Sequence, residues 1–132
     1  MLGEQIGEEK GRVTARRVLS TDPARVEVSA ETEGKLLGVA TRTIMSYQSQ
    51  LRPDGTVYGE GEGVVMGKDG DVATWKGQGV GIFGENGAIS YRGAVYYYSG
   101  SSKFERLNKI ACVFEYEVDA EGNTSSKLYE WR

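Results

Sequence analysis

The chain has 132 residues, of which 39% are hydrophobic and 27% charged, a balance typical of one globular domain and not of a disordered segment. Its net charge of -3 argues against a nucleic-acid surface, because phosphate binding needs clustered Lys and Arg. Histidine is absent, which excludes Ser-His-Asp and Cys-His catalysis as well as His-ligated zinc.

The beginning of the chain carries no recognisable targeting signal. Residues 1–9 lack a basic stretch followed by an apolar one, so we expect no signal peptide, and we expect this segment to be loosely attached to a single domain over 1–132. No apolar run approaches the roughly 18 residues of a membrane helix. The one cysteine, Cys112, lies in an apolar run that predicts a buried, inert thiol. These features predict a cytoplasmic protein without membrane contact.

Turn-forming residues divide the chain into segments of alternating polar and apolar residues. The segments are about ten residues long and rich in Val, Tyr and Thr, which is typical of β-strands. Only Ser101–Asn108 has helical character, and it is too short for a structural helix. Regular strands joined by hairpin turns predict an all-β fold, a single closed antiparallel barrel of about eight strands in a meander. The predicted strands are 10–20, 25–34, 36–51, 56–66, 72–83, 88–99, 109–118 and 124–131.

Charge pairing predicts which face of the strands lies inside the barrel. A tight turn over 68–71 places Glu62 opposite Lys76, and an opposed pair of charges belongs on the outer surface. The opposite face of both strands carries glycines and apolar residues. We therefore expect that face to line the interior, although a register slip of one residue would invert the assignment.

Aromatic rings face the glycines of this inner surface. The turns place Tyr47 beside Gly61 and Tyr91 beside Gly81, an arrangement that restores packing in curved sheets. An eight-stranded barrel is either filled by side chains or holds one small ligand, so the glycines either leave room for a ligand or only let the strands bend. Both alternatives stay open. The inward side chains that could contact a ligand are Tyr47, Trp75, Phe83, Tyr91, Tyr97, Tyr116 and Glu130.

Two charged residues share the inner face by alternation. Arg17 alternates with Val13, and Glu130 alternates with Leu128. Either charge could be buried near a barrel mouth, where a carboxylate would serve as acid or base. The alternative is that the strand ends fray and both charges reach solvent.

Two further motifs resemble ligand sites but are better explained as parts of ordinary β-strands. Gly79–Gly84 has the dinucleotide-binding spacing G-x-G-x-x-G, but it lies inside a strand and is followed by a turn, not by the helix that a phosphate site needs. Glu60 and Glu62 alternate on one strand, and Lys76 opposite them indicates a solvated face and not a metal site. We predict no metal and no cofactor, and no residue is assigned as catalytic.

The run Tyr96-Tyr97-Tyr98 sends Tyr97 inward and its two neighbours outward. Outward aromatic residues on a strand face are typical of protein contacts, which predicts a homo-oligomer through faces that include Tyr96 and Tyr98. The alternative is the ordinary preference of tyrosine for strands.

Three glycine motifs carry a family resemblance. With Gly59-x-Gly61-x-Gly63, Gly77-x-Gly79-x-Gly81 and Ser90-Tyr-Arg-Gly93, residues 36–99 resemble the allene oxide cyclase-like, calycin-type barrels. The chain is also similar to small uncharacterised bacterial proteins, from Arg52-Pro-Asp-Gly55 to the Glu130-Trp131 end. The cyclase family closes an epoxide-derived intermediate by holding it in a shaped apolar cavity, and its members often form dimers or trimers. None of its catalytic residues aligns with a position here.

Three functions are compatible with these features. The leading hypothesis is a barrel that binds a small apolar or aromatic molecule in its interior. The second is a cyclase or isomerase that uses the cavity as a shape template, aided by tyrosine hydroxyls or Glu130. The third is an oligomerising structural barrel without a ligand.

Overall fold

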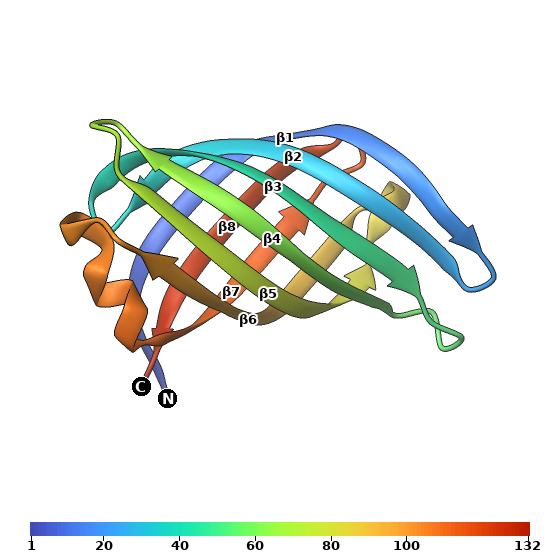
Figure 1. Cartoon of the computed structure of the whole chain (residues 1–132). Helices are drawn as coiled ribbons and strands as arrows, with labels where there is room; N and C mark the ends of the chain where they lie inside the picture. The colour runs from blue at the N-terminus through green and yellow to red at the C-terminus, as the bar shows by residue number, and fades with distance from the viewer.

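The computed structural model describes all 132 residues as one closed barrel of antiparallel strands. Each strand pairs with the next in sequence, and β8 returns to pair with β1, so the predicted all-β meander barrel is confirmed (Figure 1). None of its helices has the length and apolar character that crossing a bilayer would need. The strands are β1 (Leu2–Thr21), β2 (Ala24–Leu36), β3 (Val39–Leu51), β4 (Val57–Gly67), β5 (Val72–Phe83), β6 (Ile89–Ser99), β7 (Ala111–Val118) and β8 (Asn123–Trp131).

The register of the central strands follows the predicted turns. Glu62 of β4 pairs with Lys76 of β5, and their charged groups lie 3.7 Å apart on the exposed outer face. Tyr47 of β3 pairs with Gly61 on the inner face. Short turns fix which residues of a hairpin stand opposite one another, and alternation then assigns every side chain on both strands to one face. The predicted inner face of β3 to β6 is therefore confirmed.

The first strand differs from expectation, because residues 2–9 are not a loose segment. Gly7 pairs with Leu36 of β2 on one side and with Leu128 of β8 on the other, so this part of β1 forms the seam that closes the barrel. The predicted strand 36–51 is also interrupted, by a two-residue turn at Leu37 and Gly38. Both turn residues have positive φ, 50° and 78°, as a tight hairpin requires.

A β-bulge in β1 reverses the predicted orientation of two arginines. The register shifts between Val13 and Ala15, so one extra residue faces the partner strand. Beyond the bulge, Arg16 pairs with the inward-facing Val28, whereas Arg17 faces outward. Arg17 lies 3.6 Å from the carboxylate of Glu27 on the outer surface, so of the two alternatives for this residue its charge reaches solvent and is not buried on the inner face.

The two ends of the barrel differ. One is closed by the 3-10 helix η2 (Ser102–Lys109), which lies near both termini (Figure 1). Its Phe104 and Leu107 are fully buried in one hydrophobic cluster with Ile6 and Leu128. The prediction that this segment is too short to be a structural helix is therefore wrong, because it packs as part of the core. At the other end the β1–β2 and β3–β4 hairpins extend beyond the neighbouring strands (Figure 1).

Candidate functional site

A cavity of about 110 Å³ lies inside the barrel between two layers of packed side chains. Val95 and Leu128 line it from the hydrophobic cluster that contains the η2 residues, and Met45 and Tyr116 line it from a second cluster. Trp75 packs against both clusters. The volume is somewhat smaller than that of an engineered protein cavity that binds benzene, about 150 Å³. The barrel interior thus consists of two packed hydrophobic clusters with the cavity between them.

Five of the seven predicted ligand-contacting residues line this cavity. They reach it from the inner faces of β3, β5, β6 and β7, as alternation predicted. The structure brings them together, and their contact with a ligand stays a prediction. The five residues are Tyr47, Trp75, Tyr91, Tyr97 and Tyr116.

The other two predicted residues, Phe83 and Glu130, do not line the cavity. Phe83 is the last residue of β5, where its side chain is 48% exposed. Glu130 lies at the closed end and accepts a 2.8 Å hydrogen bond from Arg106 of η2. It holds the helix against the strands, a role that depends on how η2 folds back and that no local pattern revealed.

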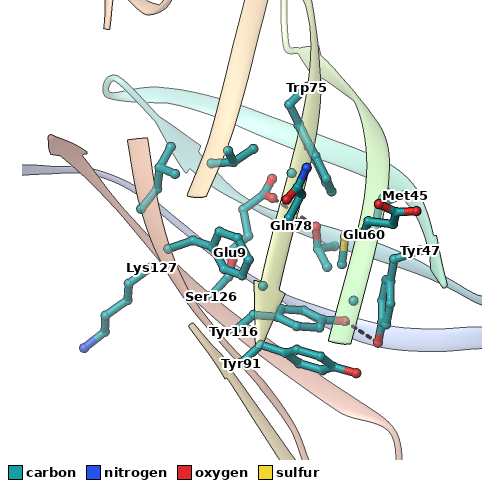
Figure 2. A pocket seen from close by; sticks show the side chains of 18 of the residues that line it. Glu9, Met45, Tyr47, Glu60, Trp75, Gln78, Tyr91, Tyr116, Ser126 and Lys127 are labelled. Carbon is teal, nitrogen blue, oxygen red and sulfur yellow. Dashed lines mark hydrogen bonds between the residues drawn. The ribbon is translucent and has the colours of Figure 1, made fainter. Parts of the chain in front are cut away.

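Three tyrosines form one layer of the cavity wall. The rings of Tyr47, Tyr91 and Tyr116 stand 5.7–6.0 Å apart, and Tyr47 meets the other two edge to face. The hydroxyls of Tyr47 and Tyr116 are hydrogen-bonded at 3.3 Å (Figure 2). The hydroxyl of Tyr91 is hydrogen-bonded to that of Ser49 at 2.8 Å. Burial raises the pKa of all three phenols, that of Tyr116 to about 12. At neutral pH they are uncharged hydrogen-bonding groups.

Glycines form the wall opposite these rings. Gly59 pairs with Gly79 and Gly61 with Gly77, so the inner face of β4 and β5 has no side chains there, and all four line the cavity. Nearby, a Cβ atom on Gly63 would overlap the indole ring of Trp75. A Cβ atom on Gly61 would lie 2.5 Å from Tyr47, and one on Gly79 would lie 3.0 Å from the Phe114 ring. The glycines therefore allow neighbouring rings and backbone to approach closely, and the places of their missing side chains are not open space.

Glu9 is the cavity residue that the sequence did not predict. Its Oε2 accepts hydrogen bonds from Thr43 at 2.7 Å and Thr41 at 3.1 Å, and its Oε1 accepts one from Thr32 at 3.1 Å. It was missed because residues 1–9 were expected to be loose. The available signal was the alternation of Gly7, Glu9 and Gly11, which matches the inner face of a strand.

The polar groups around the cavity suit binding better than metal chelation. No group of three or more His, Cys, Asp or Glu side chains gathers in the structure, so Glu9 is a single carboxylate and not part of a chelating set. Trp75, which carries an indole N–H, and Tyr97, which carries a hydroxyl, also line the cavity. Burial raises the pKa of Tyr97, and the Glu9 charge adds to the effect. The lining thus combines the Glu9 carboxylate with an indole and phenol rings, and the charged residues Glu60 and Lys127 border it.

Comparison with known proteins identifies the fold. No family model matches the chain, and no curated protein matches its sequence. Similar solved structures include a conserved protein of unknown function from Rhodopseudomonas palustris, with a TM-score of 0.82 at 12% identity, covering 98% of this chain and 97% of the other. A protein with unknown function from Clostridium acetobutylicum ATCC 824 matches with a TM-score of 0.83 at 14% identity over 96% of both chains.

A third structure, described as a beta-barrel like protein from Acinetobacter baumannii AYE, has a TM-score of 0.83 at 10% identity, covering 100% of this chain and 96% of the other. At these identities the similarity establishes the barrel fold alone. None of the three descriptions names an allene oxide cyclase-like protein, so the comparisons support the barrel and not that family.

Proposed function

We propose that this protein binds a small molecule with an apolar or aromatic body inside its barrel. The cavity carries the proposal. Close-packed interiors contain few voids larger than a water molecule, so the rings around a space of about 110 Å³ lack partner atoms on one side. A ligand that fills the space between the rings would recover these lost contacts.

Binding is supported better than catalysis. The resemblance to allene oxide cyclase-like barrels favours a shaped cavity with few reactive groups, which fits either role. However, the cyclase alternative would use tyrosine hydroxyls or Glu130, and the Glu130 carboxylate is held by Arg106 outside the cavity. The tyrosines keep their protons at neutral pH, so they would orient a ligand by hydrogen bonding.

Two neighbouring serines of β8 allow a matched test. Ser126 pairs with Glu9 and lines the cavity, whereas Ser125 pairs with Lys10 on the outer face. Ser126→Leu should fill part of the cavity, and Ser125→Leu adds the same side chain outside it. Native mass spectrometry after incubation with a metabolite extract should show a bound mass on the unmodified protein and on Ser125→Leu, and a strongly reduced one on Ser126→Leu. Equal loading of all three, or of none, would reject the proposal.

A second candidate function, self-association, is favoured by a row of side chains on the outer surface. Ile44, Val64, Thr74 and Tyr98 pair across β3 to β6, and the three larger ones are 43–67% exposed. Contiguous apolar patches on a soluble surface commonly mark protein contacts. We call this set the outer row, and Tyr96 lies beside it with 60% exposure.

Sedimentation velocity tests the outer row directly. If it is an interface, Tyr96→Glu combined with Tyr98→Glu should convert a dimer or larger assembly into monomers, because it places charges in the desolvated contact. Val18→Glu introduces the same charge at another exposed apolar position, on the β1–β2 hairpin, and should leave the assembly intact. A monomeric unmodified protein would exclude this candidate.

A further inference from the structure

We infer that the ligand of this cavity carries a positive charge: it is a small organic ammonium ion, held by the Glu9 carboxylate and by the aromatic rings of the cavity wall. The inference rests on the proposed function and specifies the ligand class. Three observations support it: the unpaired charge of Glu9, the kind of rings around it and the size of the space.

The carboxylate of Glu9 has hydrogen-bond donors but no counter-ion. Its three partners are neutral threonine hydroxyls, and no Lys or Arg forms an ion pair with it. Lys127 borders the cavity, but its side chain points away from it (Figure 2). The next charge on the inner face of β1 is Arg16, which acts at the tyrosine layer, where its charge partly offsets the raised pKa values of Tyr47 and Tyr116.

Such an arrangement favours cations over other ligands. Glu9 is partly buried, and a carboxylate withdrawn from water is stabilised when a positive charge accompanies it, which a bound ammonium group would supply. An anionic ligand would be repelled, and an apolar one would leave Glu9 unpaired. The threonines hold the carboxylate in one orientation, so the Glu9 side chain loses little conformational entropy when a cation binds.

The rings of the wall add a second attraction. The faces of Trp and Tyr rings attract cations, Trp most strongly, and desolvated contacts are worth about 2 kcal/mol. Trp75 and Tyr97 are cross-strand neighbours that both line the cavity with Glu9. Aromatic faces combined with one carboxylate are the chemistry that recognises alkylammonium groups.

The volume limits the ligand to about six heavy atoms, since a cavity of about 150 Å³ holds benzene. Two probes of this size have nearly the same shape and differ in charge: tert-butylammonium is a cation and tert-butanol is neutral. A difference between their affinities therefore measures charge recognition and not fit.

The experiment follows the indole N–H signals of the full chain by two-dimensional ¹H–¹⁵N NMR during titration with each probe. The protein has two tryptophans, and Trp131 is 56% exposed near the C-terminus, so its signal serves as an internal reference for Trp75. Trp131→Phe assigns the two signals. We expect tert-butylammonium to shift the Trp75 signal with a Kd at least about tenfold lower than that of tert-butanol.

Glu9→Gln removes the charge and keeps the shape of the side chain. It should abolish the preference for the cation while tert-butanol still binds. Glu8→Gln makes the same change on the exposed outer face of β1 and should preserve the preference. Because the ratio of two affinities is compared within each variant, a general loss of stability does not mimic the effect.

The possible failures are distinguishable. If both probes shift Trp75 with equal affinity, or if Glu9→Gln keeps the preference, the cavity binds ligands but the assignment of a cationic ligand is wrong. If neither probe shifts Trp75, nor does benzene, both this assignment and the proposed binding function are overturned. If Glu9→Gln does not fold, the comparison of the two probes on the unmodified protein still decides.

Discussion

The carboxylate of Glu9 accepts a 2.7 Å hydrogen bond from the hydroxyl of Thr43, although their strands, β1 and β3, are separated by β2. The contact passes over Gly34, which pairs with Glu9 on one side and with Thr41 on the other and has no side chain to intervene. A contact across three strands thus depends on a glycine in the middle one. It places a charge in a cavity that is otherwise lined mainly by rings and backbone.

Thr43→Val should destabilise the protein by about 1–2 kcal/mol, because it removes a hydrogen bond to the partly buried Glu9 carboxylate without changing the size of the side chain. Urea unfolding measures the change. Thr74→Val is the matched control, since Thr74 faces outward on β5 and is exposed. An equal loss of unfolding free energy in both variants would show that the hydrogen bond to Glu9 does not contribute to stability.

Phe104→Ala should cost about 3–5 kcal/mol, because Phe104 is fully buried where η2 closes the barrel, and its removal leaves a cavity. Thermal and urea denaturation both report this loss. Glu105→Ala, one residue further along η2 and exposed, should change stability little. A small effect of Phe104→Ala would mean that η2 is not part of the cooperative fold.

Gly63→Ala should displace the Trp75 ring, because the added methyl group would overlap it. We expect a loss of about 1–3 kcal/mol, together with a change in the Trp75 indole N–H signal and in tryptophan fluorescence. Gly84→Ala is the control, since its nearest neighbour would be 3.8 Å away, at ordinary contact distance. An unchanged Trp75 signal in Gly63→Ala would contradict the observed packing.

Stability should fall at alkaline pH because of the tyrosine layer. Burial raises the folded-state pKa of Tyr116 from 10.0 to about 12, so the folded state retains a proton that the unfolded chain releases between these values. The free energy of unfolding therefore decreases as pH rises through this window, by at most about 1.4 kcal/mol per pH unit for one group. The pKa values of Tyr47 and Tyr91 are shifted in the same direction.

Urea unfolding at pH 8 and pH 11 tests this dependence. Tyr116→Phe should lose less stability than the unmodified protein between the two pH values, because it has one ionisable phenol fewer in the core. Tyr98→Phe, which alters a side chain that is 67% exposed, should follow the unmodified protein. Identical slopes for Tyr116→Phe and the unmodified protein would contradict the assigned shift.

Much of the barrel wall follows from local rules. The turn at 68–71 set Glu62 opposite Lys76, and alternation along the strands then identified the inner face of β3 to β6. Five cavity residues were predicted correctly in position for the same reason. Turn geometry and the two-residue period act over short stretches, so they can be read from neighbouring residues.

The parts that were not predicted depend on contacts between residues distant in sequence, or on a β-bulge that interrupts the two-residue alternation of a strand. The bulge at Val13–Ala15 reverses the alternation, so Arg16 and not Arg17 faces inward. Phe104 closes the barrel only because η2 packs against residues from the far ends of the chain, and Glu130 is occupied by Arg106 for the same reason.

Glu9 shows this division most clearly. Its sequence context allowed an inner-face position, but only the pairing of β1 with β2 and of β2 with β3 brings the carboxylate to Thr32, Thr41 and Thr43. The strands, their turns and most of the aromatic wall can be predicted from the sequence, because local backbone preference specifies them. That a cavity remains between the rings, that η2 closes one end and that the Glu9 carboxylate borders the cavity could not be predicted, because each of these requires the closed barrel.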